Sequence, residues 1–468
     1  MVDPLLSPGS MPERGPHDKG GGLSTAIRPV RVTLPISAAS SDKAMAFRFV
    51  HSADVHLDSP LATLALRDPE LAELIGGATR KAFIAVIDLC LVEQVDALMI
   101  AGDLYDGEQT SMKTARFLAD QLRRVDEAGV KTFIIRGNHD AESRITRELI
   151  LPDSIKVFSG RAEAVSIGAG GLEAAVHGVS FAHKHAPESL LPKFRPPVPG
   201  SVNIGIMHTS LGGSLRHDLY APCTLADLHG AGFDYWALGH IHQRFEERGR
   251  AAIVMPGNPQ GRDINEAGPK TATLVTISDD RKITIEERPT SVAQFERVRI
   301  DLAGVDDWRD ALKRIEKGFE AARAAAPSEH LVARLALTGA TPLAWRVRSD
   351  ADLLAEEARV LGAAVGKTWI DKIELDCVAP KANESPPSGD PIAELRALME
   401  TEVAQSKSFH DALGEIAEEL RRNLPPIARD GLLGGDPREL AKILRALARD
   451  GAEDVLAHLR ATDRDIAA

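Results

Sequence analysis

The sequence has few cysteines, no long apolar run and no excess of positive charge. Its three cysteines, Cys90, Cys223 and Cys377, lie far apart among 468 residues. Their spacing fits neither a disulfide framework nor a zinc site, and we expect a protein of the reducing cytoplasm. The most apolar stretches are broken by charges before they reach the roughly 20 residues that a membrane-spanning helix requires. We therefore expect no association with membranes.

The overall charge of the chain excludes one simple mode of nucleic-acid binding. Hydrophobic residues make up 44% and charged residues 26%, which is typical of globular proteins, but the formal net charge is -12. A chain with this charge does not attract DNA by its bulk electrostatics. If it acts on DNA, it must do so through a local basic surface, through metal ions or with the help of a partner.

The length and composition of the chain predict several domains. Residues 1–45 are rich in Gly, Pro and Ser, and we interpret them either as a disordered extension or as upstream sequence, with translation starting at Met45. They lack the apolar core of a secretory signal. Residues 46–290 form the first predicted domain and residues 291–380 a small α+β cap domain. The stretch "KANESPPSGDP" (381–391) is a predicted linker, and amphipathic helices follow over 392–468.

Within the first domain, short apolar stretches alternate with amphipathic ones. The stretches "RKAFIAVIDLCLVEQ" (80–94) and "TSMKTARFLADQLRRVDEAG" (110–129) have the spacing and boundaries of helices. Strands are predicted around them at "FRFVH" (47–51), "VDALMIAG" (95–102) and "VKTFIIRG" (130–137). This βαβαβ order predicts a layered α/β fold with mainly parallel sheets flanked by helices. Further strands are predicted at 174–181, 201–208, 233–240 and 251–257, before a hairpin formed by "TATLVTIS" and "KITIEERP".

Five of these predicted strands are followed directly by Asp, Asn or His. The motifs are "DVH" after the first strand, "GDLYD" after the second, "GNHD" after the third, "MH" at the end of a fourth and "GHIH" after a fifth. The carboxyl ends of parallel strands share one edge, where ligand sites form. We therefore expect these side chains to meet, although each motif alone is common in turns and loops.

This set of side chains suits divalent metal ions. Carboxylate, amide and imidazole ligands without thiolates favour manganese, iron, zinc or magnesium over copper(I) or an iron–sulfur cluster. About seven candidate ligands are too many for one catalytic ion and suit two ions that share a carboxylate. The other histidines, including His51, His177, His183, His185, His217 and His229, are interpreted as surface, core or supporting residues.

The motif series from residue 54 to residue 242 resembles the calcineurin-like metallophosphoesterases. Within that superfamily the chain is similar to the branch of DNA-repair exonucleases that holds the SbcD subunit and its YhaO-like relatives. Three stretches are typical of this branch: "RFVHSADVHLDSPL", "PGNPQGRDINEAGPK" and "LTGATPL". The resemblance implies a layered sandwich with a cap domain, two divalent ions and hydrolysis of phosphodiester bonds.

The resemblance also implies a role for each motif residue. One ion would be bound by Asp54, His56 and His242, and the other by Asn138, His208 and His240. Asp103 would bridge the two ions. His139 would protonate or stabilise the leaving oxygen, and Asp140 would orient the His139 imidazole. Asp106 is a candidate to contact a metal ligand without binding the ion itself. Arg262 either contacts a substrate phosphate or forms a structural ion pair.

The function expected from this resemblance is a DNA exonuclease, 3′→5′ in direction, that acts in repair with two Mn²⁺ ions. Mg²⁺, Fe²⁺ and Zn²⁺ are the other candidate ions. The family implies a coiled-coil ATPase partner of the structural-maintenance type, similar to SbcC or YhaN, for which the C-terminal helices are the candidate dock. Relatives typically form homodimers. Two other functions stay open: a phosphoesterase for small phosphodiesters or phosphoproteins, and an inactive scaffold that regulates the ATPase.

Overall fold

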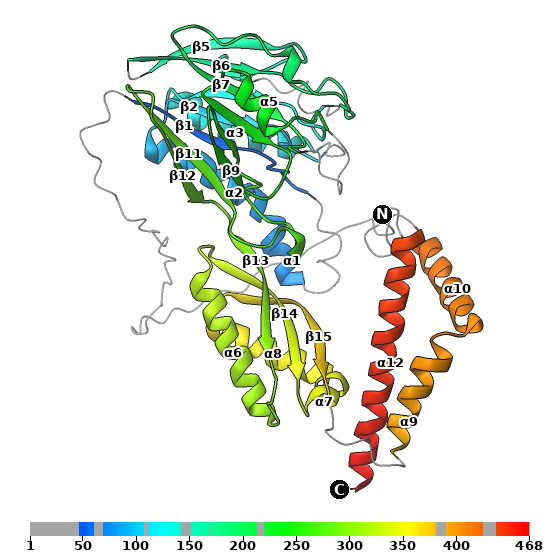
Figure 1. Cartoon of the computed structure of the whole chain (residues 1–468). Helices are drawn as coiled ribbons and strands as arrows, with labels where there is room; N and C mark the ends of the chain where they lie inside the picture. The colour runs from blue at the N-terminus through cyan, green and yellow to red at the C-terminus, as the bar shows by residue number, and fades with distance from the viewer. Residues whose placement is uncertain are drawn as a thin grey trace, which may run out of the picture. The chain divides into compact units, whose positions relative to one another are not determined.

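The computed structural model describes residues 46–59, 69–106, 111–141, 151–169, 171–212, 220–380, 390–424 and 437–467. The predicted N-terminal extension (1–45) and residues 381–389 of the predicted linker lie outside these ranges. Two six-stranded sheets, a separate three-stranded sheet and a group of C-terminal helices make up the described part of the chain (Figure 1). None of the helices described is both long and apolar enough to cross a membrane.

The first sheet contains the predicted βαβαβ unit. Its strand order is β12-β11-β1-β2-β3-β4, in which β1 to β4 run parallel and β11 pairs antiparallel with β1. The strand bounds are β1 (Ala46–Ser52), β2 (Ala97–Ala101), β3 (Lys131–Ile135), β4 (Ile155–Val157), β11 (Thr271–Ser278) and β12 (Ile283–Pro289). The predicted strands, the hairpin and the two helices, α2 (Ala78–Glu93) and α3 (Met112–Glu127), are confirmed. The short strand β4 and the helix α1 (Pro69–Gly76) were not predicted.

Successive side chains along each strand point to opposite faces of this sheet, and both faces are buried. One face, with Val50 and Leu98, packs against α2 and α3 through Phe83 and Leu122. The other face carries side chains such as Phe49 into a second core that it shares with the next sheet. Because both faces are covered, the parallel strands read as continuous apolar runs in the sequence.

The second sheet stacks on the first and has the order β5-β6-β7-β8-β10-β9. Its strands are β5 (Glu163–Ala169), β6 (Leu172–Gly178), β7 (Val202–His208), β8 (Tyr235–Gly239), β9 (Phe245–Arg248) and β10 (Ala252–Met255). Strands β6, β7, β8 and β10 run parallel, with β5 and β9 antiparallel at the edges. The outer face packs around Trp236 beside the short α5 (Leu225–Gly230) and η2 (Leu191–Lys193). The predicted sandwich therefore consists of two sheets.

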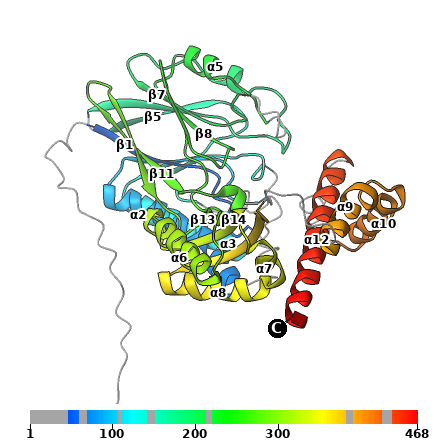
Figure 2. The same cartoon turned by 60° about the horizontal axis from the view of Figure 1, so that its bottom comes forward.

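A third, parallel sheet with its own core follows along the chain. The strands β13 (Ala293–Asp301), β14 (His330–Ala340) and β15 (Thr368–Val378) lie in this order. Three helices complete the core: α6 (Trp308–Ala325), α7 (Ala344–Ser349) and α8 (Ala351–Val365). Figure 2 shows α6 and α8 side by side across this sheet. The predicted alternation of strands and helices is confirmed, and α7 is an addition to it.

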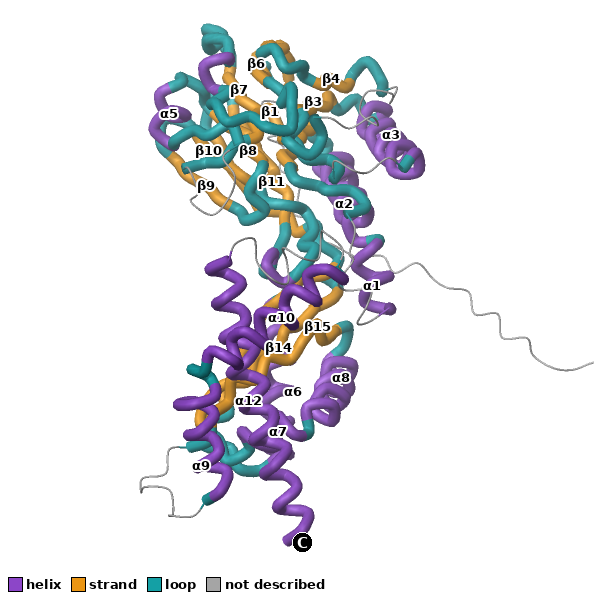
Figure 3. Tube along the Cα trace, turned by 90° about the vertical axis from the view of Figure 1, so that its right-hand side faces the viewer, coloured by secondary structure: helices purple, strands orange, loops and turns teal. Residues whose placement is uncertain are grey.

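The C-terminal region is helical, as predicted. It contains α9 (Pro391–Leu398), the π-helical turn η4 (Met399–Val403), α10 (Lys407–Asn423) and α12 (Pro437–Ala467), shown in purple in Figure 3. Helices α9 and α12 contact α7. The guanidinium groups of Arg396 and Arg460 lie over the ring of Trp345, and Arg348 pairs with Asp450 and Asp454 at 2.9 and 2.8 Å.

Candidate metal centre

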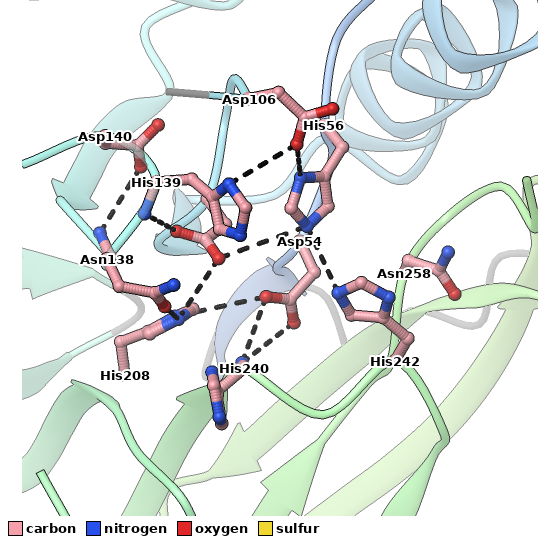
Figure 4. A network of polar contacts seen from close by, with 12 residues as sticks. Asp54, His56, Asp106, Asn138, His139, Asp140, His208, His240, His242 and Asn258 are labelled. Carbon is pink, nitrogen blue, oxygen red and sulfur yellow. Dashed lines mark hydrogen bonds and ion pairs between the residues drawn. The ribbon is translucent and has the colours of Figure 1, made fainter. Parts of the chain in front are cut away.

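The predicted ligands come together where strands of both sheets end. Strands β1, β2 and β3 of the first sheet and β7 and β8 of the second release the motif residues at one shared edge (Figure 4). Three groups of three carry ligand atoms within 4.8 Å of one another. Two of them consist of predicted ligands: Asp54, His56 and His242, and Asp54, Asp103 and His208. The third is His56, Asp106 and His139. Because Asp54 belongs to both groups of predicted ligands, they define two adjacent positions for a positive charge.

The backbone at this edge is strained in order to aim the side chains inward. Asp54, His56, Asp103 and His240 have φ angles of 53°, 46°, 54° and 109°, in a region that residues other than glycine rarely adopt. Hydrogen bonds between the motifs hold this conformation. The Asp54 amide donates to the carbonyl of Gly102 at 3.0 Å, and the His240 amide donates to both carboxylate oxygens of Asp54 at 3.0 and 2.9 Å.

The glycine of the "GNHD" motif lets two motifs approach closely. A Cβ at Gly137 would lie 2.2 Å from Oδ1 of Asp103 and 2.8 Å from Cε1 of His208. The missing side chain also allows the His139 amide to donate to the same Asp103 oxygen at 3.0 Å. Asp103 is thereby held between β2, β3 and β7, at the centre of the site.

The imidazoles of His56 and His242 have the geometry of metal ligands. Nδ1 of His56 lies 2.6 Å from Oδ1 of Asp106, and Nδ1 of His242 lies 2.7 Å from Oε1 of Glu266. A carboxylate only accepts hydrogen bonds, so each Nδ1 carries the proton and each Nε2 keeps a lone pair. These two Nε2 atoms lie 3.1 Å apart. Two lone pairs at this distance repel each other unless a proton or a metal ion lies beside both, so the two residues fit a divalent ion that takes the place of the proton.

His208 is oriented in the same way by the backbone. Its Nδ1 donates to the carbonyl of Ala101 at 2.9 Å, and its Nε2 lies 3.0 Å from Oδ1 of Asn138 and 3.3 Å from Oδ2 of Asp103. Burial would lower the pKa of His208, but the charges of Asp103 and Asp54 outweigh it and raise the pKa to about 9. This shift shows how strongly the pocket favours positive charge.

His240 lies next to His208, with 5.1 Å between the ring centroids. Its backbone amide donates a hydrogen bond to Asp54. Its ring lies next to the group of Asp54, Asp103 and His208, but His240 is not a member of any of the groups of three. All seven predicted ligands are thus placed at this edge, five of them buried and His240 and His242 partly exposed.

His139 stands at the open side of the centre. Its side chain is 38% exposed, and its Nδ1 lies 3.5 Å from Oδ1 of Asp106. Asp106, rather than the expected Asp140, is therefore the carboxylate beside the His139 ring. Asp140 is buried and accepts hydrogen bonds from the backbone amides of Leu104, Tyr105 and Gly137 at 3.1, 3.0 and 3.3 Å. It ties the "GDLYD" and "GNHD" turns together.

Comparison with known proteins assigns the family. Residues 47–244 match the calcineurin-like phosphoesterase family, and residues 295–378 match the middle domain of metallophosphoesterase YhaO. The chain is 30% identical over 311 residues to the uncharacterized metallophosphoesterase YhaO of Bacillus subtilis, covering 66% of this chain and 75% of that protein. The chain belongs to the YhaO-like calcineurin-like metallophosphoesterases. Members of this family use two divalent metal ions, and the two groups of ligands are where this metallophosphoesterase would hold them.

Other relatives of this metallophosphoesterase are described as DNA-repair proteins or nucleases. It is 26% identical over 304 residues to the DNA double-strand break repair protein Mre11 of Sulfurisphaera tokodaii, covering 61% of this chain and 73% of that protein. It is also 33% identical over 101 residues to the SbcD component of the nuclease SbcCD of Rhodobacter capsulatus, covering 21% of this chain and 22% of that protein.

The structure adds one residue that the sequence analysis missed and redefines another. Glu266 of the metallophosphoesterase hydrogen-bonds the metal-ligand candidate His242. The guanidinium of Arg262 donates to Glu266 at 2.7 Å and to Ser59 at 3.3 Å, and lies 3.9 Å from Asp106. These contacts favour the structural ion pair for Arg262 over a contact with substrate. The sequence does hold a signal for this ion pair: Arg262 and Glu266 are four residues apart in "GRDINE", a spacing that fits one helical turn.

Proposed function

We propose that this metallophosphoesterase is a two-metal-dependent DNA nuclease, a 3′→5′ exonuclease that acts in cytoplasmic DNA repair with Mn²⁺ as its ion. The observation that carries the proposal is the arrangement at the shared strand edge. Two groups of ligands share Asp54 in a buried, anionic pocket, and one imidazole, His139, stands open beside them. This arrangement suits a phosphodiester that enters from the side of His139.

The chemistry divides between the ions and the protein. Two divalent ions bound here would neutralise the phosphate and supply a nucleophile from water near neutral pH. His139 would protonate or stabilise the leaving oxygen; because its Nδ1 faces Asp106, donation from Nε2 requires the doubly protonated imidazolium. The strained turns at Asp54 and Asp103 hold the ligands in place before substrate arrives, so little reorganisation is needed during the reaction.

Aromatic rings beside the centre support a nucleic-acid substrate. Tyr220 lies 5.3 Å from the ring of His240, and the exposed ring of His185 stacks on Tyr220 with 6.4 Å between centroids and 15° between planes. A base next to the scissile phosphate could stack on this rim, and such stacking tolerates any base sequence. The relatives described as break-repair proteins and as part of a nuclease support the same substrate.

A partner would overcome the weak attraction for DNA that follows from the net charge of -12. The C-terminal helices present exposed apolar side chains that suit docking to the coiled coil of an ATPase similar to SbcC or YhaN. These side chains are Leu398, Val403, Ile416, Leu420, Leu447, Val455 and Leu459. In this proposal the ATPase supplies much of the DNA affinity, the small domain of β13 to β15 positions the DNA, and the nuclease acts as a homodimer.

The test compares wild type with His139→Ala on linear double-stranded and single-stranded DNA with Mn²⁺. His410→Ala, an exposed histidine on α10, is the matched control. We expect His139→Ala to keep two bound ions and to lose about 10²- to 10⁴-fold in rate, as loss of a general acid does. The control should cleave DNA at the wild-type rate.

The direction of cleavage is read from strands labelled at one end. A wild-type protein that binds two ions and leaves every DNA intact, both alone and with the ATPase, would overturn the nuclease proposal. Cleavage of a small phosphodiester such as bis(p-nitrophenyl) phosphate by the same sample would then identify a small-molecule phosphodiesterase.

A further inference from the structure

Glu266 connects a ligand of the metal centre to a part of the chain outside it. The residue ends the short helix η3 (Ile264–Glu266), and its side chain is only 12% exposed. Its Oε1 lies 2.7 Å from Nδ1 of His242. The pair resembles His56 and Asp106, in which Nδ1 of His56 lies 2.6 Å from Oδ1 of Asp106.

The charge of Glu266 decides which nitrogen of His242 carries the proton. Both oxygens of the Glu266 carboxylate face N–H donors, from Arg262 to Oε1 and from Arg262 and Asn258 to Oε2. The carboxylate is therefore an acceptor only. Nη2 of Arg262 also lies 3.1 Å from Nδ1 of His242, but the shorter contact to a charged acceptor favours a proton on Nδ1. Nε2 then faces the metal position with its lone pair free.

Several donors keep the Glu266 carboxylate in one orientation. Arg262 donates its backbone amide to Oε2 at 2.8 Å and its Nη2 to Oε1 at 2.7 Å, and Nδ2 of Asn258 donates to Oε2 at 2.8 Å. The same guanidinium lies 3.9 Å from Asp106. One arginine thus stands between the two carboxylates that orient His56 and His242.

The short helix that bears Glu266 is anchored on the third sheet. Ile264 is buried in a cluster with Phe295 of β13, Val332 of β14 and Leu71 of α1. The amide of Gly268, just after the helix, donates to the carbonyl of Phe295 at 2.9 Å. The segment therefore places Ile264 against the small domain and Glu266 against the metal ligand.

We propose that Glu266 is a positioning residue for metal binding: it holds His242 in the tautomer and orientation that present Nε2 to one of the two ions. Ile264 and Arg262 hold Glu266 in turn, so the small domain supports one half of the centre. This inference rests on the two-metal part of the proposed function and is independent of the DNA substrate.

The test is a calorimetric titration of the full chain with Mn²⁺. Glu266→Gln should weaken binding of one ion by about 10- to 100-fold, as loss of such a partner does, and leave the other ion within about threefold. The amide can donate to Nδ1 and so favours the wrong tautomer. Glu163→Gln is the matched control, because Glu163 also forms a close ion pair, 2.6 Å from Lys156, but lies away from the centre. His242→Ala should weaken the same ion as Glu266→Gln.

The visible absorption bands of the Co²⁺-loaded protein report on the ligands around each bound ion. We expect Glu266→Gln to change the bands of one ion only, and Glu266→Asp, which keeps the charge with a shorter reach, to lie between wild type and Glu266→Gln. If Glu266→Gln does not fold, as judged by circular dichroism, Glu266→Asp carries the test.

Two outcomes would overturn the inference. One is wild-type affinity for both ions in a folded Glu266→Gln protein, and the other is an equal loss of both ions. A wild type that binds two ions but cleaves no DNA would refute the nuclease and leave the role of Glu266 standing. A wild type that binds fewer than two ions would refute both.

Discussion

Among the glycines that the structure describes, Gly239 of the "GHIH" motif is the one where an added methyl group would lie closest to a backbone atom. A Cβ there would lie 2.1 Å from the carbonyl oxygen of Ala101 and 3.0 Å from Cβ of Ala53. The obstacle is the backbone of β2, which has no rotamer by which to move away. The same Ala101 oxygen accepts the hydrogen bond from Nδ1 of His208, so relief would displace a ligand of the centre.

The size of the effect follows from this geometry. Overpacking a rigid core costs about 1–3 kcal/mol, and the clash with backbone places Gly239→Ala near the upper end of that range. A loss of about 3 kcal/mol corresponds to a fall in melting temperature of about 6–12 °C for a domain of about 150–250 residues. Binding of Mn²⁺ should weaken as well, because His208 and Asp103 both lie against the displaced strands.

Calorimetric melting of the full chain, with and without Mn²⁺, measures both effects, and the transition that Mn²⁺ shifts reports on the metal-binding domain. Gly414→Ala in α10 is the matched control. Among the described residues, no heavy atom lies within 4 Å of the Cβ that alanine would add there, apart from those of its own helix and chain neighbours. Alanine should stabilise that helix by about 0.5–1 kcal/mol. A Gly239→Ala protein that melts within about 2 °C of wild type and binds both ions normally would refute the argument.

Replacing Asp58 with Asn should lower the free energy of unfolding by about 1 kcal/mol at pH 7, because its carboxylate accepts two hydrogen bonds from the partly exposed Arg80. Burial alone would raise the pKa of Asp58, but these hydrogen bonds lower it. The stabilisation is therefore present above about pH 4 and is lost as the pH falls through the folded-state pKa. Curves of unfolding free energy against pH for wild type and variant should converge in acid. Chelating the metal should lower the melting temperature, since each ion held at 100 times its dissociation constant adds about 2.7 kcal/mol, and an unchanged temperature would contradict a two-ion centre. Trp345→Ala should speed protease cleavage of α12 without changing Mn²⁺ binding, because Arg396 and Arg460 both lie over that ring; equal cleavage rates would show that the ion pairs alone hold the helices.

Local pattern was sufficient to predict most of the longer strands and helices and to select the candidate ligands. Apolar runs of strand length, each closed by Asp, Asn or His, identify both the strand and the edge at which it ends. The sequence therefore predicted that Asp54, Asp103, Asn138, His208 and His240 would meet, and the structure brings them together. The short elements α1, β4 and β9 were not predicted, because segments of 8, 3 and 4 residues carry too little periodicity. The edge strand β5, of 7 residues, was not predicted either.

Partners of the ligands were harder to predict, because they depend on how segments distant in the sequence pack together. Asp140 follows His139 in the chain, yet its carboxylate turns to the backbone amides of Leu104 and Tyr105, and Asp106 takes the place beside the His139 ring. No local pattern distinguishes these two aspartates.

The sequence by itself determined which residues could bind metal, because each follows a strand whose apolar pattern is local. The tertiary structure alone decided how those residues are held. Stacking two sheets brings His208 and His240 against Asp54 and Asp103, and packing Ile264 onto the small domain carries Glu266 to His242. A hydrogen bond between residues far apart in the chain forms only when the packing of whole elements sets the distance, and no short stretch of sequence encodes that distance.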